Sequence, residues 1–444
     1  MLRIIKLGLL VLTPFSFTFG QKDCSFDNTG KIPLIDLAGG YFNGVAGGLY
    51  PGGTNTRPPE HLAKCIEHVS LIQPLNSAGN PDASGKVVML GIGASNPMVE
   101  FQQFKEFSEG FDPLNDALEI INACEGGIAI QKMYEVSDTY WLGVDNLLED
   151  SGLSPKQVQV IWVEQENTNS YDTLFNTATT ALVNDFLRLM KVIKIKFPNA
   201  QICYVSARTY AGYADPIDPE VSKGLLYPRD YFNGWAIKRL VENVINAIAE
   251  YDYEGVDAVI PLVTWGTYNW TDGSTPRNDG LFLDCEEDTD PDGLHLSGAG
   301  DYKFGQYMFE YFKTDTTAKY WYYDEGFLGI ENQHQSKSEI QIIPNPASGN
   351  TIKFNTNAFF PNEQVNYQIA DATGKVIATG IAEKQYPIVF LLDGYKICER
   401  YFSLRAIANI IYSTQINANR NLCISVLPCF LQAFFSVKNP LMDY

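Results

Sequence analysis

The sequence turns on one stretch, Val87-Val-Met-Leu-Gly91-Ile-Gly93-Ala-Ser95, in which an apolar run leads into a glycine-rich segment that ends in a serine. A short apolar run bounded by glycine is typical of a buried β-strand. Glycines at 91 and 93 allow the chain to turn tightly from this strand into a helix. We therefore predict a strand over 86–90 and a turn whose backbone N–H groups surround Ser95.

The same alternation of strand and helix continues along the chain. Further apolar strands are predicted at Gln157–Val163, Ala200–Val205 and Val256–Val263, and helical patterns cover Thr177–Lys196, Asn233–Tyr251 and Ala299–Phe312. This order predicts an α/β fold with a parallel sheet and helices on both faces. Ligands bind such sheets at the carboxyl ends of the strands, where Ser95 and Asn167 would both lie.

The length of 444 residues predicts more than one domain. Residues 24–325 carry the α/β pattern, and the polar stretch 326–338 is typical of a linker. Residues 339–384 then switch to a β pattern and predict a small sandwich-like module. Its expected strands are Ile340–Ile343, Thr351–Asn355, Val365–Ala370 and Val376–Ile381. The tail over 385–444 changes composition again, and we assign it no fold.

Residues 1–20 are typical of a secretory signal peptide, because a short apolar run follows Arg3 and Lys6 and no acid interrupts it. No later stretch is long and apolar enough to span a membrane. The formal net charge of -20 disfavours nucleic-acid binding. We expect a secreted or outer-surface protein.

Eight cysteines are scattered without a C-x-x-C pair, which excludes a zinc ribbon or a thioredoxin motif. In an exported protein some of them could form disulfides, although spacing alone does not give the connectivity. Cys24 with Cys65 is the pairing that we would test first. Cys124 and Cys203 are at least as well explained as isolated buried residues.

A possible base for Ser95 occurs in Asp292-Gly-Leu-His295, one of only four histidine positions in the chain. A serine hydroxyl needs a base to take its proton, and that base needs a carboxylate to fix its tautomer. Three-residue spacing in a loop can place Asp292 against Nδ1 of His295 and leave Nε2 free. The competing interpretation is a surface turn before a helix that Ser297 caps, and we favour the catalytic one.

Two loops after apolar segments offer donors for an oxyanion. The backbone N–H of Gly127 and the side-chain amide of Asn167 could join the N–H of Ser95. Taken alone, each of these loops is better explained as an ordinary turn, and Gly126 is an alternative to Gly127.

The stretch that starts at Asp288 begins like a calcium loop, because acids and a glycine occupy its first positions. Ala299 stands where the bidentate glutamate is needed, and Pro291 lies inside the loop. We predict no metal site and no cofactor.

Together these blocks resemble the SGNH (GDSL-like) hydrolase superfamily. Ser95, Gly127 and Asn167 match its first three blocks, and Asp292 with His295 matches the last. The resemblance implies a flavodoxin-like three-layer α/β/α fold and cleavage of acyl esters, often acetyl groups on carbohydrate. The first block departs from the usual pattern, because Gly93-Ala-Ser95 replaces Gly-Asp-Ser.

Residues 40–322 look most like a poorly characterised exported bacterial subgroup of that superfamily, through stretches such as Ser206-Ala-Arg-Thr-Tyr210 and Trp265-Gly-Thr-Tyr-Asn-Trp270. Five side chains could line a sugar cleft, although a buried core explains any single aromatic better: Arg208, Tyr210, Trp265, Tyr268 and Trp270. Residues 340–384 resemble the C-terminal sorting domain of the type IX secretion system, which implies a Bacteroidetes-type exporter as partner.

We therefore predict a secreted serine esterase that acts on acylated carbohydrate, with acetyl as the expected acyl group. The main alternative is a surface carbohydrate-binding protein on a catalytically inactive hydrolase fold. A calcium-dependent adhesion module is a third possibility, which Ala299 disfavours.

Overall fold

The computed structural model describes residues 22–217 and 221–324, and beyond Asp324 it describes only the backbone of short strands. The chain divides into two compact units, Met1–Asp324 and Glu325–Tyr444. The predicted signal peptide and linker fall outside the described residues, as do all side chains of the predicted sorting module and of the tail.

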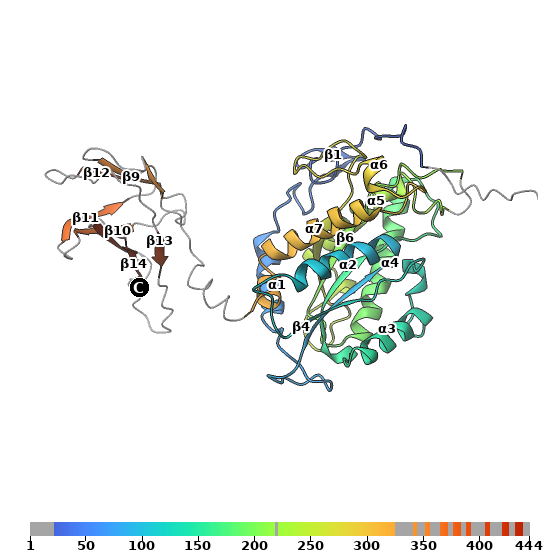
Figure 1. Ribbon diagram of the computed structural model, residues 1–444, viewed down its shortest axis with the longest axis horizontal. Coiled ribbons are helices and arrows are strands. Elements are labelled where there is room, and N and C mark those ends of the chain that lie inside the picture. The colour runs from blue at the N-terminus through green and yellow to red at the C-terminus, as the bar shows by residue number, and fades with distance from the viewer. Residues whose placement is uncertain are drawn as a thin grey trace, which may run out of the picture. The chain divides into compact units, whose positions relative to one another are not determined.

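The first unit, coloured from blue to orange in Figure 1, is built on a five-stranded sheet. The strand order is β4-β3-β5-β6-β7, and every neighbouring pair is parallel. Its strands are β3 (Val87–Gly93), β4 (Leu118–Asn122), β5 (Val158–Glu164), β6 (Ile202–Ala207) and β7 (Leu262–Tyr268). Every residue of β3, β5, β6 and β7 is buried, because helices cover both faces of a sheet of this kind.

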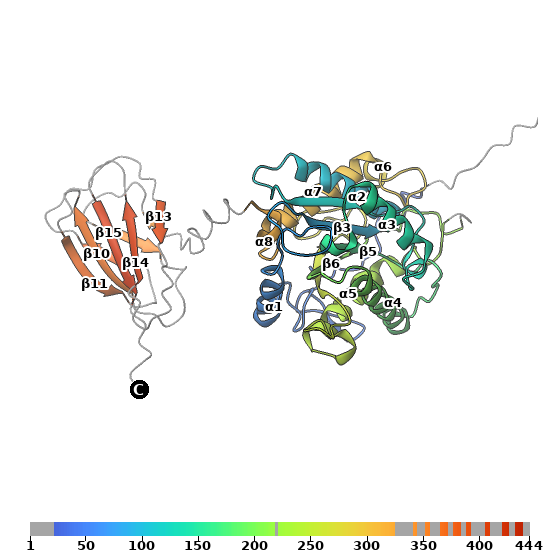
Figure 2. The same cartoon turned by 90° about the horizontal axis from the view of Figure 1, so that it is seen from below.

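Helices α2 and α7 pack on one face of this sheet, and α1, α4 and α5 pack on the other (Figure 2). The helices of the described unit are α1 (Pro59–Val69), α2 (Ser95–Glu109), α3 (Thr139–Asp150), α4 (Phe175–Lys196), α5 (Arg229–Ile245), α6 (Cys285–Asp288), α7 (Gly298–Thr314) and α8 (Lys319–Tyr322). Three 3₁₀ turns, η1 (Ile130–Lys132), η2 (Pro155–Gln157) and η3 (Ala249–Tyr251), and a short pair, β1 (Tyr41–Phe42) with β2 (Val45–Ala46), complete it. No described helix is long and apolar enough to cross a membrane.

The α/β prediction is confirmed, and three of the predicted strands and two of the predicted helices lie within about three residues of the observed ones. The helix predicted at Asn233–Tyr251 is observed at Arg229–Ile245, and its predicted end falls in η3. The fourth strand was placed wrongly at Val256–Val263, since β7 begins only at Leu262. Val256 is fully exposed and follows Gly255, whose φ of +72° marks a turn. Val256 and Val259 therefore lie in an exposed loop, Ile260 is already buried, and the strand begins two residues later.

Residues 22–54 pack against β7, α5 and the loop after β7 before α1 begins, and we call this segment the N-terminal wrap. Backbone groups of the wrap hydrogen-bond to aromatic side chains of the core, for example Leu34 N to the hydroxyl of Tyr268 (3.0 Å). A disulfide joins Cys24 to Cys285, with a Cα–Cα distance of 5.6 Å. The Cys24–Cys65 pairing is therefore wrong: Cys65 is a free buried thiol inside α1.

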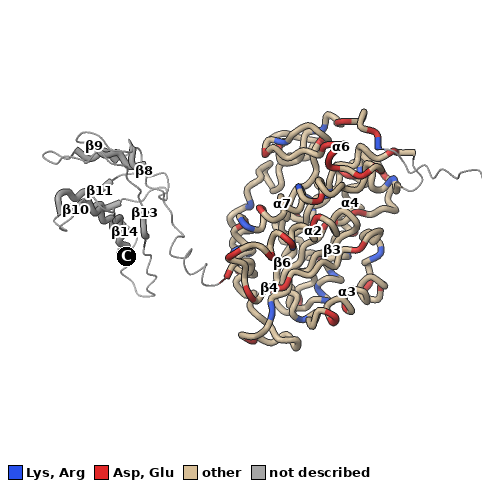
Figure 3. Tube along the Cα trace, in the orientation of Figure 1, with Lys and Arg blue, Asp and Glu red and all other residues tan. Residues whose placement is uncertain are grey.

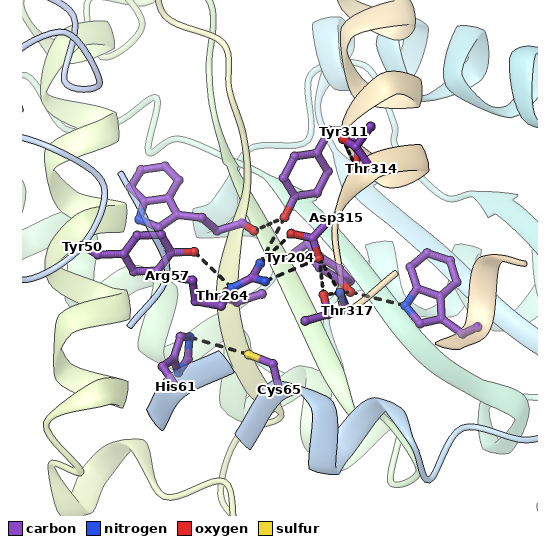
Figure 4. Close-up of polar contacts among 12 residues, drawn as sticks. Tyr50, Arg57, His61, Cys65, Tyr204, Thr264, Tyr311, Thr314, Asp315 and Thr317 are labelled. Carbon is purple, nitrogen blue, oxygen red and sulfur yellow. Dashed lines mark hydrogen bonds and ion pairs between the residues drawn. The ribbon is translucent and has the colours of Figure 1, made fainter. Parts of the chain in front are cut away.

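A buried polar cluster fixes the end of the N-terminal wrap against the sheet and the end of α7 (Figure 4). The Arg57 guanidinium pairs with the carboxylate of Asp315 at 2.9 Å and donates to the hydroxyls of Tyr50 and Thr264 at 3.3 and 3.2 Å. Asp315 follows the last residue of α7. The cluster therefore lies about 25 Å, the length of α7, from the loop that precedes this helix.

The second unit contains two antiparallel sheets. Their strands are β8 (Gln341–Ile343), β9 (Thr351–Asn355), β10 (Val365–Asp371), β11 (Val376–Ala382), β12 (Ile388–Leu391), β13 (Arg405–Ala408), β14 (Arg420–Ser425) and β15 (Leu431–Val437). Basic residues of the first unit are interspersed among a larger number of acidic ones (Figure 3), in keeping with 52 acidic and 32 basic residues in the whole sequence.

Candidate active site

Ser95 lies at the carboxyl end of β3, as the first residue of α2. The chain turns sharply here because Gly93 has no side chain: a Cβ at that position would stand 2.1 Å from Cβ of Pro97. The first N–H groups of a helix have no partner within it and carry the positive end of its dipole. This serine therefore stands where backbone donors face outward.

His295 and Asp292 come from the loop before α7, and they meet Ser95 at the same edge of the sheet. Nε2 of His295 is 2.9 Å from Oγ of Ser95, and Nδ1 is 2.5 Å from a carboxylate oxygen of Asp292. The other carboxylate oxygen of Asp292 accepts from the backbone N–H of Leu294 and of His295, at 2.9 and 3.0 Å. The structure thus brings together the three residues that the sequence predicted as a serine, base and acid.

Electrostatics define how this histidine is protonated. Burial alone would raise the pKa of Asp292, but hydrogen bonds from the His295 side chain and from two backbone N–H groups lower it to about 2. The hydrogen bond to Asp292 in turn raises the pKa of His295 above its ordinary value, although partial burial opposes the shift. With Asp292 ionised, Nδ1 carries the proton and Nε2 is left to accept from the serine.

Asn96 holds the histidine loop against the start of α2. Its Nδ2 donates to the carbonyl of Leu294 at 3.0 Å, and its Oδ1 accepts from the N–H of Leu296 at 3.2 Å. These two bonds bracket His295 on both sides. The sequence pattern gave Asn96 no role, because residues two hundred positions apart in the chain meet only in the folded protein.

The N-terminal wrap holds the same loop from outside. Lys22 donates from Nζ to the carbonyl of Cys285 at 2.7 Å, and its backbone N–H donates to the carbonyl of Pro291 at 2.7 Å. The Cys24–Cys285 disulfide adds a covalent link at the start of α6. The loop that carries Asp292 and His295 is therefore fixed by α2 on one side and by the wrap on the other.

Ser95 opens into a small pocket with a volume of about 90 Å³. Gly127 forms another part of its wall, in the loop after β4, with a φ of +74° that suits glycine. Side chains around it include Glu164, Arg208, Leu225 and Leu294. Gly127 therefore lies on the same pocket as Ser95, as the sequence led us to expect.

Two buried carboxyl groups share one amide behind this pocket. Nδ2 of Asn269 lies 3.0 Å from an oxygen of Glu100 and 3.0 Å from an oxygen of Glu164. Burial raises the pKa of Glu100 to about 8 and that of Glu164 well above its usual value. Both carboxyl groups therefore favour the neutral form at moderate pH.

Asn167 does not supply the side-chain donor that the sequence predicted for an oxyanion. Its Nδ2 donates to the carboxylate of Asp185 at 2.8 Å and to the hydroxyl of Tyr134 at 3.2 Å. Both amide hydrogens are thus engaged on α4 and the loop after η1, and Asn167 is not among the residues that line the pocket. Its orientation follows from these tertiary partners, which spacing along β5 does not reveal.

The four aromatic residues predicted for a sugar cleft are buried instead. Each is at most 2 % exposed: Tyr210, Trp265, Tyr268 and Trp270. Two of them bind backbone carbonyls of the N-terminal wrap. Nε1 of Trp265 donates to the carbonyl of Leu49 (2.7 Å), and the hydroxyl of Tyr210 donates to the carbonyl of Phe26 (3.0 Å), so these side chains stabilise the fold. Of the five predicted residues, only Arg208 lines the pocket.

Two acids in the stretch before His295 are engaged in hydrogen bonds. Asp288 accepts from Lys303 and from the backbone N–H of Asp284, and Asp292 is bonded to His295. Within residues 22–217 and 221–324, no group of three or more His, Cys, Asp or Glu is arranged to hold a metal ion.

No protein-family model matches the sequence, and no curated protein matches it. The structure is distantly similar to several solved structures. It aligns with a protein from Slackia heliotrinireducens that carries a provisional SGNH hydrolase assignment, with a TM-score of 0.31 and 13% identity over 51% of this chain and 99% of that one.

Two further solved structures are also distantly similar. A gut microbial diltiazem-metabolizing enzyme gives a TM-score of 0.30 and 12% identity, over 67% of this chain and 70% of its own. A protein from Arabidopsis thaliana gives 0.24 and 13% identity, over 48% of this chain and 66% of its own.

Proposed function

We propose that this chain is an exported serine esterase of the SGNH type that removes short acyl groups, acetyl in the first place, from carbohydrate. The arrangement of Ser95, His295 and Asp292 carries the proposal, through contacts of 2.9 Å and 2.5 Å. The strand order, which is 2-1-3-4-5 when the sheet strands are numbered along the chain, supports a flavodoxin-like fold for this unit.

In the proposed reaction, Oγ of Ser95 attacks the ester carbonyl while Nε2 of His295 takes its proton. The tetrahedral intermediate collapses when His295 returns that proton to the leaving alcohol. Water then attacks the acyl-serine by the same route and releases the carboxylic acid. Asp292 keeps the His295 ring in place and stabilises its charged form during both steps.

Backbone N–H groups of Ser95 and Gly127 are the proposed donors to the oxyanion. Ser95 supports this role by its place at the N-terminus of α2, and Gly127 supports it by its place on the pocket wall. The amide of Asn167 is left out of the proposal, because Asp185 and Tyr134 hold it elsewhere.

The pocket supports a short acyl group, since about 90 Å³ is well below the several hundred Å³ typical of sites for drug-sized ligands. The four aromatics predicted for a sugar cleft are buried and offer a sugar no stacking surface, so the carbohydrate part of the proposal rests on the family resemblance. Export remains a proposal as well, and it rests on the signal-peptide pattern over 1–20, the disulfide and the likeness of 340–384 to a sorting domain recognised by the type IX machinery.

The test is to label the full mature chain with a fluorophosphonate and to locate the label by peptide mass spectrometry. We expect the label on Ser95 in the wild type and its loss in His295→Ala. Ser108 serves as a matched control within α2, because it is buried and hydrogen-bonded to Tyr322 at 2.7 Å and should remain unlabelled.

Hydrolysis of 4-nitrophenyl acetate, butyrate and octanoate then tests the acyl group. We expect kcat/KM to fall as the acyl chain lengthens, because the pocket is small. A well-folded wild-type protein that takes up no fluorophosphonate and hydrolyses none of these esters would overturn the proposed function.

A further inference from the structure

Arg208 stands in the pocket wall without an acceptor for its guanidinium. It follows the last residue of β6, is 7 % exposed, and lines the same pocket as Ser95. Its backbone N–H donates to Asn233, but Nη1 is fully buried and has no hydrogen-bond partner. Within residues 22–217 and 221–324, no acceptor faces any nitrogen of this guanidinium at hydrogen-bond distance.

The neighbouring acids are engaged with other groups or favour the neutral form. Asp230, whose pKa burial raises and the nearby charge of Arg208 lowers, accepts from the backbone N–H of Ala211 and from Nε1 of Trp270. Glu166 lies 2.7 Å from the guanidinium of Arg229, with which it forms a buried ion pair. Glu164 and Glu100 each accept from Asn269, and burial shifts both toward the protonated state. The positive charge of Arg208 is therefore not cancelled by a direct contact from the protein.

A buried cation without a partner is costly, and an arginine cannot relieve this cost by losing its proton. Its planar guanidinium matches a carboxylate, which it can bind through two parallel hydrogen bonds. Because the guanidinium shares a pocket with the attacking serine, an anion bound there would belong to the same molecule as the ester. The chain is acidic overall, so short-range pairing rather than its long-range field has to attract that anion.

We propose that Arg208 selects esters that carry a carboxylate close to the scissile carbonyl. The inference rests on the proposed function and names the substrate class of the same site. The carboxylate can belong to the acyl part, as in the monoester of a short dicarboxylic acid. It can instead belong to the alcohol, as in an acylated hydroxy acid or sugar acid, and the pocket recognises the same group in both.

Two matched pairs of substrates separate these sources. For the acyl part, 4-nitrophenyl hemisuccinate is compared with 4-nitrophenyl butyrate. For the alcohol, 2-acetoxypropanoate is compared with 2-acetoxypropanamide, and released acetate is measured. We expect the wild type to prefer the anionic member of at least one pair about 10- to 100-fold in kcat/KM, as a charged hydrogen bond in a buried site implies.

The change Arg208→Gln should reduce this preference toward one, whereas Arg208→Lys, which keeps the charge but not the two-pronged geometry, should retain part of it. Arg239→Gln is the matched control, since Arg239 binds Asn176 and Thr180 on α4, lies outside the pocket, and should keep the wild-type ratio. A wild type without anionic preference in either pair overturns the proposal, and so does an Arg208→Gln variant that loses both members by the same factor.

A binding experiment keeps the proposal separate from catalysis. Monomethyl succinate and 2-acetoxypropanoate are titrated calorimetrically into Ser95→Ala, and into Ser95→Ala combined with Arg208→Gln. Binding to the first protein and its loss in the second would support anion recognition even if Ser95 proved unreactive. Absence of binding to Ser95→Ala, together with turnover of neutral esters by the wild type, would remove the carboxylate from the substrate and leave the esterase standing.

Discussion

At the scale of single residues, the protonation of His295 depends on one carboxylate. Asp292 accepts from Nδ1 at 2.5 Å and also holds the backbone N–H of residues 294 and 295. A neutral amide of the same shape cannot keep all three contacts, because its –NH2 group donates where a carboxylate oxygen accepts. If its oxygen stays on the two backbone N–H groups, the –NH2 faces Nδ1 and favours the wrong ring tautomer, and the charged ring has no counter-ion in either orientation.

The change Asp292→Asn should therefore lower kcat about 10²- to 10⁴-fold on 4-nitrophenyl acetate. The pH profile of kcat/KM gives a second readout. In the wild type, activity should rise with pH as His295 loses its proton, with a midpoint above the ordinary histidine value because Asp292 raises the pKa. The variant should move that midpoint to lower pH. An unchanged midpoint in Asp292→Asn would contradict this role.

Asn96 acts on the same histidine through the backbone. Because its amide holds the carbonyl of Leu294 and the N–H of Leu296, Asn96→Ala should let the loop drift away from Ser95. We expect kcat to fall about tenfold or more, since small displacements of a catalytic group are costly. KM should change little. The His295 midpoint in the pH profile should stay near that of the wild type, because Asp292 is untouched; a large shift would show that Asn96 acts on the charge instead.

Residue by residue, the sequence could predict what depends on local spacing. Asp292 and His295 are three positions apart in one loop, and Ser95 ends a glycine-rich strand turn, so their meeting follows from the topology of a parallel sheet. The orientation of the Asn167 side chain depends on its hydrogen bond to Asp185. Arg208 is notable only because its neighbours are bonded to other partners and leave Nη1 without an acceptor. Neither of these contacts can be predicted from the spacing of residues in the sequence.

At the scale of elements, the contact between α2 and β5 contains a titrating pair. Glu100 of α2 and Glu164 of β5 lie on either side of the amide of Asn269, just past β7, and both are almost completely buried. A buried acid with a raised pKa binds its proton more tightly in the folded chain than in the unfolded chain. The free energy of unfolding therefore falls as pH rises between the two values.

For Glu100 this window runs from its ordinary value near 4.5 to about 8. Glu100→Gln mimics the protonated form and cannot titrate. The slope of the unfolding free energy against pH between pH 5 and 8 should therefore become less negative, by at most about 1.4 kcal/mol per pH unit, which corresponds to one proton. Urea unfolding at several pH values measures this slope. Glu106→Gln, on the same helix and bonded only to Gln102 and Gln103 in the structure, should keep the wild-type slope.

The elements themselves illustrate which patterns are informative. The buried strand β5 has a continuous apolar run over residues 160–163, and it was predicted to within one residue at each end. The stretch 256–260 has similar letters but follows a glycine turn, and the true β7 contains Thr, Gly and Tyr, which lower its apolar signal. Tyr268 and Trp265 are buried because the N-terminal wrap packs over them. The sequence of β7 alone does not predict that contact.

At the scale of the whole molecule, the N-terminal wrap closes the chain on itself. Cys24 and Cys285 are separated by 261 positions, and with eight cysteines their connectivity could not be inferred from spacing. The link adjoins the loop that carries Asp292 and His295, where Lys22 also binds three backbone carbonyls. We therefore expect both the stability of the fold and the activity to depend on this disulfide.

Replacing both cysteines by serine should lower the free energy of unfolding by about 2–5 kcal/mol, since the disulfide restricts a very long loop of the unfolded chain. It should also lower kcat, because the loop before α7 keeps its contacts with Asn96 but loses its covalent support from the wrap. Urea unfolding and hydrolysis of 4-nitrophenyl acetate measure the two effects on the same samples. Dithiothreitol should reproduce both in the wild type and change nothing in Cys24→Ser/Cys285→Ser. If reduction destabilised the wild type without slowing it, the wrap would support the fold alone, and Asn96 would suffice to hold His295 against Ser95.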